Sequence, residues 1–145
     1  MTNGARNPDP FPAFAFELRI TGLAVGGFSE CAGLQLETEF QEYSEGGENS
    51  FVHKFPTRTK QGNITLKRGI VDRSIWDWYW DLTQGAVAPR NASIVVYDPA
   101  RKNKIHWDLV RALPCKWVGP DLNATQNSVA LETLELCYQR ILYRR

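Results

Sequence analysis

The sequence has few of the residues that build catalytic or metal sites. Its three cysteines, Cys31, Cys115 and Cys137, lie far apart and form no CxxC pair. An odd number of cysteines at such spacings predicts free thiols in a protein made in a reducing compartment, rather than a disulfide framework. The two histidines, His53 and His106, have no second His, Cys or carboxylate at the spacing of metal ligands. The sequence therefore predicts no metal site and no cofactor.

Long apolar runs and an excess of one charge are also missing. No stretch approaches the ~18 apolar residues of a membrane span, and residues 1–12 have no apolar run of the signal-peptide kind. We therefore expect synthesis in the cytoplasm without a signal peptide, and no direct membrane anchoring. Seventeen Lys and Arg residues oppose sixteen Asp and Glu residues, which leaves a formal net charge of +1. The basic field that drives nonspecific binding to nucleic acid is thus absent, and a nucleic-acid-binding function is disfavoured.

What the chain does have is alternating apolar and polar residues, the pattern of half-buried strands. Segments with this pattern include residues 14–20, 92–98, 104–112 and 129–143. A phase change near Thr133 predicts a bulge or a change of buried face there. The length suits a single domain over residues 1–145, with an extended, proline-containing arm at residues 1–12. We expect a mainly β fold, a small antiparallel β-barrel or sandwich with one flanking α-helix and a projecting β-hairpin.

Residues 72–85, DRSIWDWYWDLTQG, carry the one strong helix signal. Asp72 or Ser74 can cap its start and Gly85 can close its end. Apolar and aromatic residues at helical spacing predict one broad buried face. The residues assigned to this face are Ile75, Trp76, Tyr79, Trp80 and Leu82. We expect the helix to cover the sheet with it.

Charge is segregated over residues 34–69. Residues 34–49 carry five carboxylates and no Lys or Arg, whereas residues 50–69 carry five Lys or Arg and no carboxylate. Alternation around Gly46 and Gly47 predicts two antiparallel strands and a turn, with an acidic strand beside a basic one. Such an arm can neutralise itself, because each cross-strand pair contributes roughly 0.2 to 1 kcal/mol. It can also pair with other copies, and a contact between two different patches of one surface builds rings or filaments.

The length of this hairpin favours docking on a partner over burial in a core. Pro56 removes a ladder donor and is expected to end or fray the second strand. An exposed arm with unpaired edges invites aggregation unless it is partnered. We predict that it docks on a partner. The residues predicted to make this contact are Glu42, Tyr43, Glu45, Gly46, Gly47, Glu48, Asn49, Lys54, Arg58, Lys60, Lys67 and Arg68.

Other patterns point to chemistry less directly. Cys31 or Cys115 could pair with a histidine as a nucleophile, but no base-orienting third group accompanies them, and a structural thiol is the preferred interpretation. The carboxylates Glu132 and Glu135 are interpreted as parts of a solvated strand face. The alternative to an assembly protein is a monomeric ligand-binding β-barrel with a pocket near several tryptophans. Those tryptophans are Trp76, Trp78, Trp80 and Trp107.

Four motifs occur in order along the chain: FSECAGL at residues 28–34, EYSEGGEN at 42–49, HKFPTRTKQGNITLKRG at 53–69 and DRSIWDWYW at 72–80. This order resembles the tail-tube protein family of contractile phages and related injection systems. The resemblance extends over nearly the whole chain in length and strand pattern, and its most specific part contains these motifs. Thr57 departs from the pattern, since such proteins often carry a glycine there.

The resemblance implies a structural, non-enzymatic subunit of an inner tube. Six copies would form a ring, and rings would stack into a hollow tube inside a contractile sheath that drives it through a target envelope. Implied partners are further copies, the sheath, baseplate and tube-cap proteins, and cargo, protein or DNA, in the lumen. The assembly would be a phage tail, an extracellular or injected tail-like particle, or a type VI-like system. The hairpin would reach the next subunit or the next ring, and the chain would serve as the main tube or as its initiator.

Overall fold

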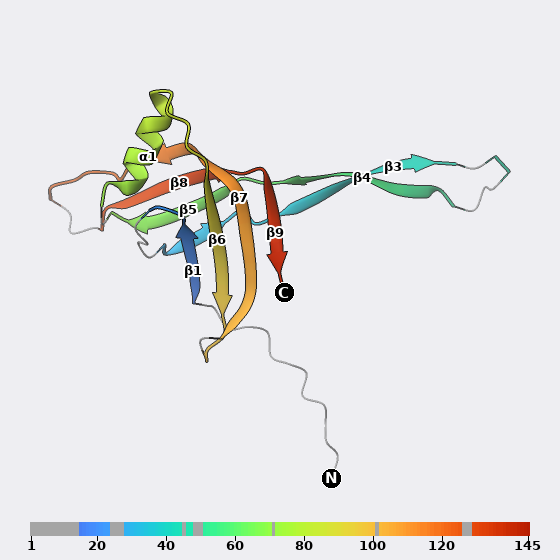
Figure 1. Cartoon of the computed structure of the whole chain (residues 1–145), viewed down its shortest axis with the longest axis horizontal. Coiled ribbons are helices and arrows are strands. Elements are labelled where there is room, and N and C mark those ends of the chain that lie inside the picture. The colour runs from blue at the N-terminus through green and yellow to red at the C-terminus, as the bar shows by residue number, and fades with distance from the viewer. Residues whose placement is uncertain are drawn as a thin grey trace, which may run out of the picture.

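The chain folds into a curled body and one long arm (Figure 1). This computed structural model describes residues 15–23, 28–44, 46–47, 51–70, 72–100, 102–125 and 129–145. The arm is a hairpin of β3 (Leu36–Tyr43) and β4 (His53–Gln61), and the body holds the other strands and the helix. The predicted N-terminal arm, residues 1–12, lies outside the described residues.

The strands of the body form one seven-stranded antiparallel sheet. They are β1 (Phe16–Ile20), β2 (Glu30–Ala32), β5 (Ile64–Gly69), β6 (Arg90–Tyr97), β7 (Asn103–Val118), β8 (Leu131–Cys137) and β9 (Arg140–Arg144). Their order is β1-β6-β7-β8-β5-β2, and β9 pairs with β7 outside this path. The sheet curls into an open half-barrel, as Figure 1 shows.

Strand β7 turns the sheet from one half of the body to the other. Its first part pairs with β6 and β9, and its second part, from Leu113 onward, pairs with β8. Between the two parts, Arg111 has a φ of 53°, a left-handed conformation that non-glycine residues rarely adopt. The Arg111 N–H donates to the Asn91 side-chain oxygen at 3.1 Å. This corner allows a single strand to belong to both halves of the curled sheet.

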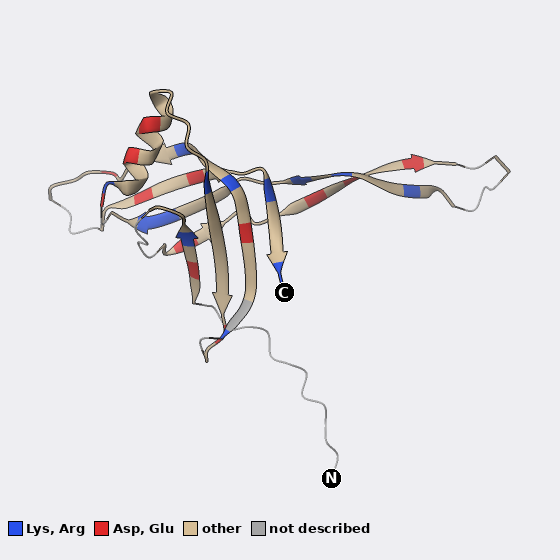
Figure 2. Cartoon of the chain, viewed as in Figure 1, with Lys and Arg blue, Asp and Glu red and all other residues tan. Residues whose placement is uncertain are grey.

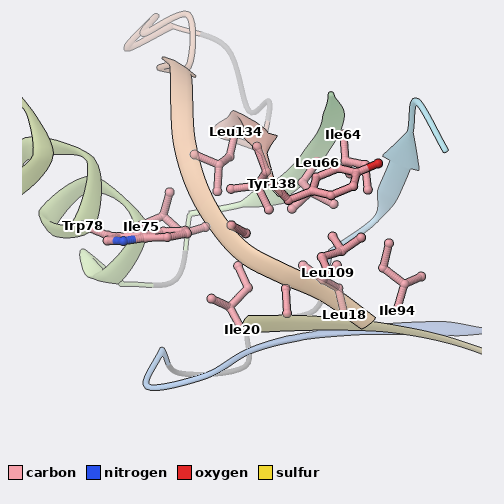
Figure 3. Close-up of a cluster of buried hydrophobic side chains, with 13 residues drawn as sticks. Leu18, Ile20, Ile64, Leu66, Ile75, Trp78, Ile94, Leu109, Leu134 and Tyr138 are labelled. Atoms are coloured by element: carbon pink, nitrogen blue, oxygen red, sulfur yellow. The ribbon is translucent and has the colours of Figure 1, made fainter. Parts of the chain in front are cut away.

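The hydrophobic core lies inside the curl (Figure 3). Alternate residues of the body strands point into it, because successive strand side chains leave opposite faces. Buried residues from β1, β5 and β8 are Leu18, Ile20, Ile64, Leu66, Leu134 and Leu136. β6 adds Ala92 and Ile94, and β7 adds Leu109 and Ala112. The strand periodicity in the sequence therefore corresponds to a continuous apolar interior.

Helix α1 (Ser74–Thr83) packs against β7 within the range that the sequence predicted. At its start, Asp72 Oδ1 accepts hydrogen bonds from the Ser74 N–H at 2.9 Å and from the Ser74 hydroxyl at 2.6 Å. At its end, Gly85 adopts a φ of 92°, which L-residues avoid. Turn chemistry at both ends thus limits the helix to ten residues.

The buried face of α1 differs from the predicted one. Ile75 and Trp78 are buried, whereas Trp76 and Trp80 are exposed. With 3.6 residues per turn, position 78 returns to the face of position 75 while positions 76 and 80 rotate away from it. Trp78 also donates its indole N–H to the Ala88 carbonyl at 3.0 Å. The helical pattern was recognised correctly, but two tryptophans were assigned to the wrong side.

The C-terminal segment forms two strands instead of the single long strand that alternation predicted. β8 is regular, with Glu132, Leu134 and Leu136 buried on one side, so the bulge expected near Thr133 is wrong. The pattern looked out of phase because a charged residue, Glu132, takes a core position. After β8 the chain crosses to the other part of β7, where β9 pairs.

The fold-class prediction is confirmed: the chain is mainly β, with one flanking helix and a projecting hairpin. In the single subunit the barrel is open, because β1 and β2 stand at the two ends of the strand order. None of the helical segments in the described ranges has the length and hydropathy needed to span a bilayer.

Candidate assembly interface

The β3–β4 hairpin forms a two-stranded sheet of its own and extends far from the body (Figure 1). Its ladder runs from Leu36 opposite Gln61 to Tyr43 opposite His53. Neither strand has a further strand partner among the described residues. Both long edges therefore present backbone groups that can pair with another chain.

The acidic and basic strands of the hairpin neutralise each other. Glu39 pairs with Lys60 and lies 3.5 Å from Arg58, and Glu42 lies 3.7 Å from Lys54. The hydrogen bond from Lys60 is the main cause that holds the pKa of Glu39 below its ordinary value. Figure 2 shows the acidic positions on β3 beside the basic positions on β4. The segregation that is clear along the sequence therefore largely disappears in space.

Apolar side chains on the hairpin stay exposed to solvent, although some of their rings stack on one another. Leu36, Phe40 and Phe55 are 59%, 57% and 49% exposed. Tyr43 stacks on both His53 and Phe55, with ring centroids 5.0 Å apart in each case. We define the hairpin apolar set as Leu36, Phe40, Tyr43, Phe51, Val52 and Phe55, all of them exposed. Apolar patches of this kind on a soluble protein mark interaction surfaces.

Sequence reasoning missed most of this set as contact residues. Of its six members, only Tyr43 was predicted to touch a neighbour. Alternation puts Leu36 and Phe40 on one strand face, but a period of two does not say whether anything covers that face. An arm that projects beyond the body needs a second apolar segment to cover its apolar face. The sequence offers no such segment, and this was the signal that was missed.

The second strand of the hairpin continues through Pro56, contrary to the prediction that it would end or fray there. The register passes from Glu39 opposite Arg58 to Phe40 opposite Pro56, which leaves Thr57 as an extra residue in a bulge. The Thr57 hydroxyl donates to the Glu39 carbonyl at 3.0 Å. A bulge is one of the few places where a sheet tolerates proline, because the missing N–H needs no ladder partner there.

The predicted contact residues near the tip are only partly described. Glu45, Glu48 and Asn49 lie outside the described residues. Gly46 and Gly47 form a turn, in which Gly47 has a φ of 96°. This conformation explains why glycine occupies the turn position.

Two predicted contact residues belong to the body instead of the hairpin. Lys67 and Arg68 lie on β5, so the hairpin is shorter than the charge-segregated range of residues 34–69. Lys67 is half-buried and lies 3.4 Å from Glu30. Arg68 is 1% exposed, with Nε 2.7 Å from Glu132 and Nη2 2.9 Å from Asp72. Since Arg68 is enclosed by its own subunit, it cannot serve as a docking residue.

A polar cluster on β6, β7 and β9 contains serine, histidine and aspartate but not a catalytic arrangement. Asp108 accepts from the Ser93 hydroxyl at 2.9 Å, and its Oδ1 lies 2.9 Å from His106 Nε2. Arg144 pairs with the other carboxylate oxygen. Serine and histidine both bond to the aspartate, whereas a nucleophile would need the histidine to contact the serine. The cluster therefore joins neighbouring strands.

The cysteines have the properties of structural thiols. Burial raises the pKa of Cys31 to about 11, and desolvation is also the main reason that the pKa of Cys115 rises to about 11. The thiolate is the reactive form, so such pKa values leave little of it at neutral pH and disfavour a catalytic nucleophile. Within the described ranges, no group of three or more His, Cys, Asp or Glu side chains could hold a metal ion.

The tryptophans do not converge on a ligand pocket. Trp78 is in the core, while Trp76 and Trp80 are exposed and stack with ring centroids 5.8 Å apart. Trp76 also contacts Trp117 of β7, with centroids 4.7 Å apart. Trp107 packs against the core from β7. An open apolar cavity of about 290 Å³ does exist, but it is lined by Phe16, Cys31, Leu34, Ile94 and Val96. The geometry predicted for the alternative ligand-binding barrel is thus not present.

The sequence matches a known family over almost its whole length. The family described as T4-like virus tail tube protein gp19 is matched by residues 12–142. No curated protein gave a significant sequence match.

Solved structures resemble the chain in fold. A chain from the extracellular contractile injection system PVC sheath–tube complex in the extended state has a TM-score of 0.78 and 24% identity, covering 94% of this chain and 93% of that one. A chain from the PVC sheath/tube terminator has a TM-score of 0.79 and 24% identity, with 94% and 97% covered. A chain from the anti-feeding prophage baseplate has a TM-score of 0.69 and 27% identity, with 92% and 95% covered.

Proposed function

The chain belongs to the T4-like virus tail tube protein family, and from this premise we propose that copies dock through the β3–β4 hairpin into six-membered rings that stack into a hollow tube. The chain is a tube subunit, and the hairpin is the part that joins it to its neighbours. The observation that carries this proposal is the hairpin apolar set, exposed on an arm that its own subunit does not cover.

The driving force for docking comes from these apolar side chains. Removing apolar surface from water contributes roughly 25 cal/mol per Å², and aromatic residues are enriched at the centres of protein interfaces. The ion pairs of Glu39 and Glu42 already satisfy the hairpin charges. In the assembly those charges therefore set register and orientation more than affinity. The unpaired strand edges add backbone hydrogen bonds to an adjacent chain.

The further partners follow from the same premise. We propose that a sheath surrounds the tube and that baseplate and cap proteins bind its two ends, as in the complexes that contain the structural relatives. The lumen carries protein or DNA cargo, and the assembled particle acts outside the cell that makes it. The chain has a structural role without catalysis, which agrees with the raised thiol pKa values of Cys31 and Cys115.

The proposal is tested with a variant that removes apolar surface from the hairpin without touching its charges. In Phe40→Ser/Phe55→Ser, we expect a folded monomer by circular dichroism and light scattering, and no tubes or rings by negative-stain electron microscopy. Phe40→Leu/Phe55→Leu is the matched control, because it keeps the apolar character and should still assemble. Long tubes from the serine variant would overturn the role of the hairpin. If the wild type formed rings with seven-fold symmetry, or with a symmetry lower than six-fold, the proposed ring size would be wrong.

A further inference from the structure

Two cysteine side chains occupy the space between β7 and β8. Cys115 Sγ donates to the Glu135 carbonyl at 3.3 Å, and Cys137 Sγ donates to the Leu113 carbonyl at 3.6 Å. Each thiol therefore crosses to the main chain of the opposite strand. Cys115 bonds to the residue two positions before Cys137, and Cys137 bonds to the residue two positions before Cys115. The two hydrogen bonds therefore form a symmetric pair.

A bulge in β7 brings the two thiols together. The register passes from Pro114 opposite Leu136 to Lys116 opposite Glu135, which leaves Cys115 as the extra residue. In an unbroken ladder Cys115 would face Glu135 and share a strand face with Cys137, two positions away. The bulge shifts Cys115 along the ladder toward Cys137, and Cys137 is among the groups that raise the pKa of Cys115.

The pair can also be reached from solvent. Cys115 is exposed and Cys137 is half-buried. Cys31, by contrast, lies on β2 and packs against the core. Cys115 and Cys137 thus form a dithiol. Cys31 is a separate thiol against which the reactivity of the pair can be compared.

We propose that Cys115 and Cys137 react with low-molecular-weight disulfides and close into an intrachain disulfide between β7 and β8. The Cys115 thiolate attacks one sulfur of the reagent, forms a mixed disulfide and releases the first small thiolate. The Cys137 thiolate then attacks the Cys115 sulfur and releases the second small thiolate. Two electrons pass from the cysteines to the reagent, and the two protein protons end on the two released thiols.

Closure is slow at neutral pH. Desolvation, with contributions from Cys137 and Glu135, raises the pKa of Cys115 to about 11, and only the thiolate attacks a disulfide. The dithiol therefore stays reduced during synthesis and closes during long exposure to oxidising surroundings. The extracellular setting rests on the proposed function, but the closure itself needs only the folded subunit. The bond joins β7 to β8 and stabilises their pairing.

The test uses the full-length subunit incubated with oxidised glutathione at pH 9, then alkylated after denaturation and examined by mass spectrometry. We expect two of the three thiols to become protected, with one cross-linked peptide that joins Cys115 to Cys137. Cys31 should remain free to react with the alkylating reagent. The oxidised chain should run as a monomer on a non-reducing gel. Its melting temperature should rise by roughly 10 °C and return on reduction.

Single-cysteine variants make the result specific. Cys31→Ser should close like the wild type, whereas Cys115→Ser and Cys137→Ser should stop at a mixed disulfide with glutathione; circular dichroism checks that each is folded. The proposal is overturned if the wild type accumulates a stable glutathione adduct on Cys115, keeps all its thiols, or forms only disulfides between chains. Tube assembly is scored separately on the reduced protein by electron microscopy. Failure of the dithiol and failure of the tube proposal are therefore distinguishable.

Discussion

Arg68 and Glu132 stand directly opposite each other on β5 and β8 and form a buried ion pair, with Nε and Oε1 2.7 Å apart. Glu132 also accepts the indole N–H of Trp117 on β7 at 3.0 Å. Arg68 in turn bonds to Asp72 at the start of α1 and lies over the ring of Phe28, 5.5 Å from its centroid. One charge pair thereby connects three strands with the helix.

Breaking this pair from one side should destabilise the subunit strongly. Arg68→Met leaves the Glu132 carboxylate buried without its cation, and we expect the free energy of unfolding to fall by about 3–5 kcal/mol. Arg68→Met/Glu132→Leu should lose less, because no charge is left uncompensated. Urea unfolding measures the free energy of unfolding of both variants. Lys67→Met is the control: it lies next to Arg68 on the same strand with its side chain 44% exposed, and the change should alter stability by about 0.5 kcal/mol or less. Equal losses in the single and double variants would contradict the assignment.

Stability should fall in acid in part because of Asp108. Burial alone would raise the pKa of Asp108, but hydrogen bonds from Ser93, Arg144 and His106 outweigh it, and the pKa lies below its ordinary value. The folded state then binds fewer protons than the unfolded state, so the contribution is present above about pH 4 and is lost as the pH falls below it. The difference in unfolding free energy between wild type and Asp108→Asn should therefore be larger at pH 7 than at pH 3. A difference that does not change between these pH values would rule out this role.

The bulge at Thr57 should determine where the hairpin points. Deleting Thr57 restores a regular ladder with the same residue pairs, but it removes the local bend and extra twist of a bulge. We expect a folded subunit whose assembly into tubes is lost, as seen by circular dichroism and electron microscopy. Thr57→Gly is the matched control, since it keeps the bulge and loses only the 3.0 Å hydrogen bond to Glu39. Normal tubes from the deletion variant would show that the bulge has no part in aiming the arm.

Charge at the acidic strand should affect assembly more than folding. In Glu42→Lys/Glu45→Lys/Glu48→Lys we expect a folded monomer that no longer stacks into tubes, because the new cations oppose those of neighbouring arms. The pair between Glu42 and Lys54 is exposed on both sides, and exposed pairs contribute little to stability. Thermal melting should thus change little while electron microscopy shows no tubes. Long tubes formed by this variant would exclude an electrostatic part in ring stacking.

Much of the fold could be predicted from local patterns. Alternation predicted the strands, glycine pairs predicted turns, and the spacing of Ile75 with Leu82 predicted a helix that packs on one side. The same patterns failed at Glu132 and Arg68, because a charged residue in an alternating strand is assigned to solvent by default. Their burial depends on β5 pairing with β8 in one particular register, and that pairing joins residues far apart in the chain.

In the candidate interface, too, some features follow from the local sequence and others depend on the tertiary structure. The sequence by itself determined that an antiparallel arm lies within residues 34–69, because side-chain alternation and turn conformation are properties of the local backbone. Only the tertiary structure decided that Glu39 and Glu42 are already paired within the arm and that Phe40 and Phe55 are not covered. Whether a strand face is buried depends on what packs against it, and the arm projects beyond the reach of its own body.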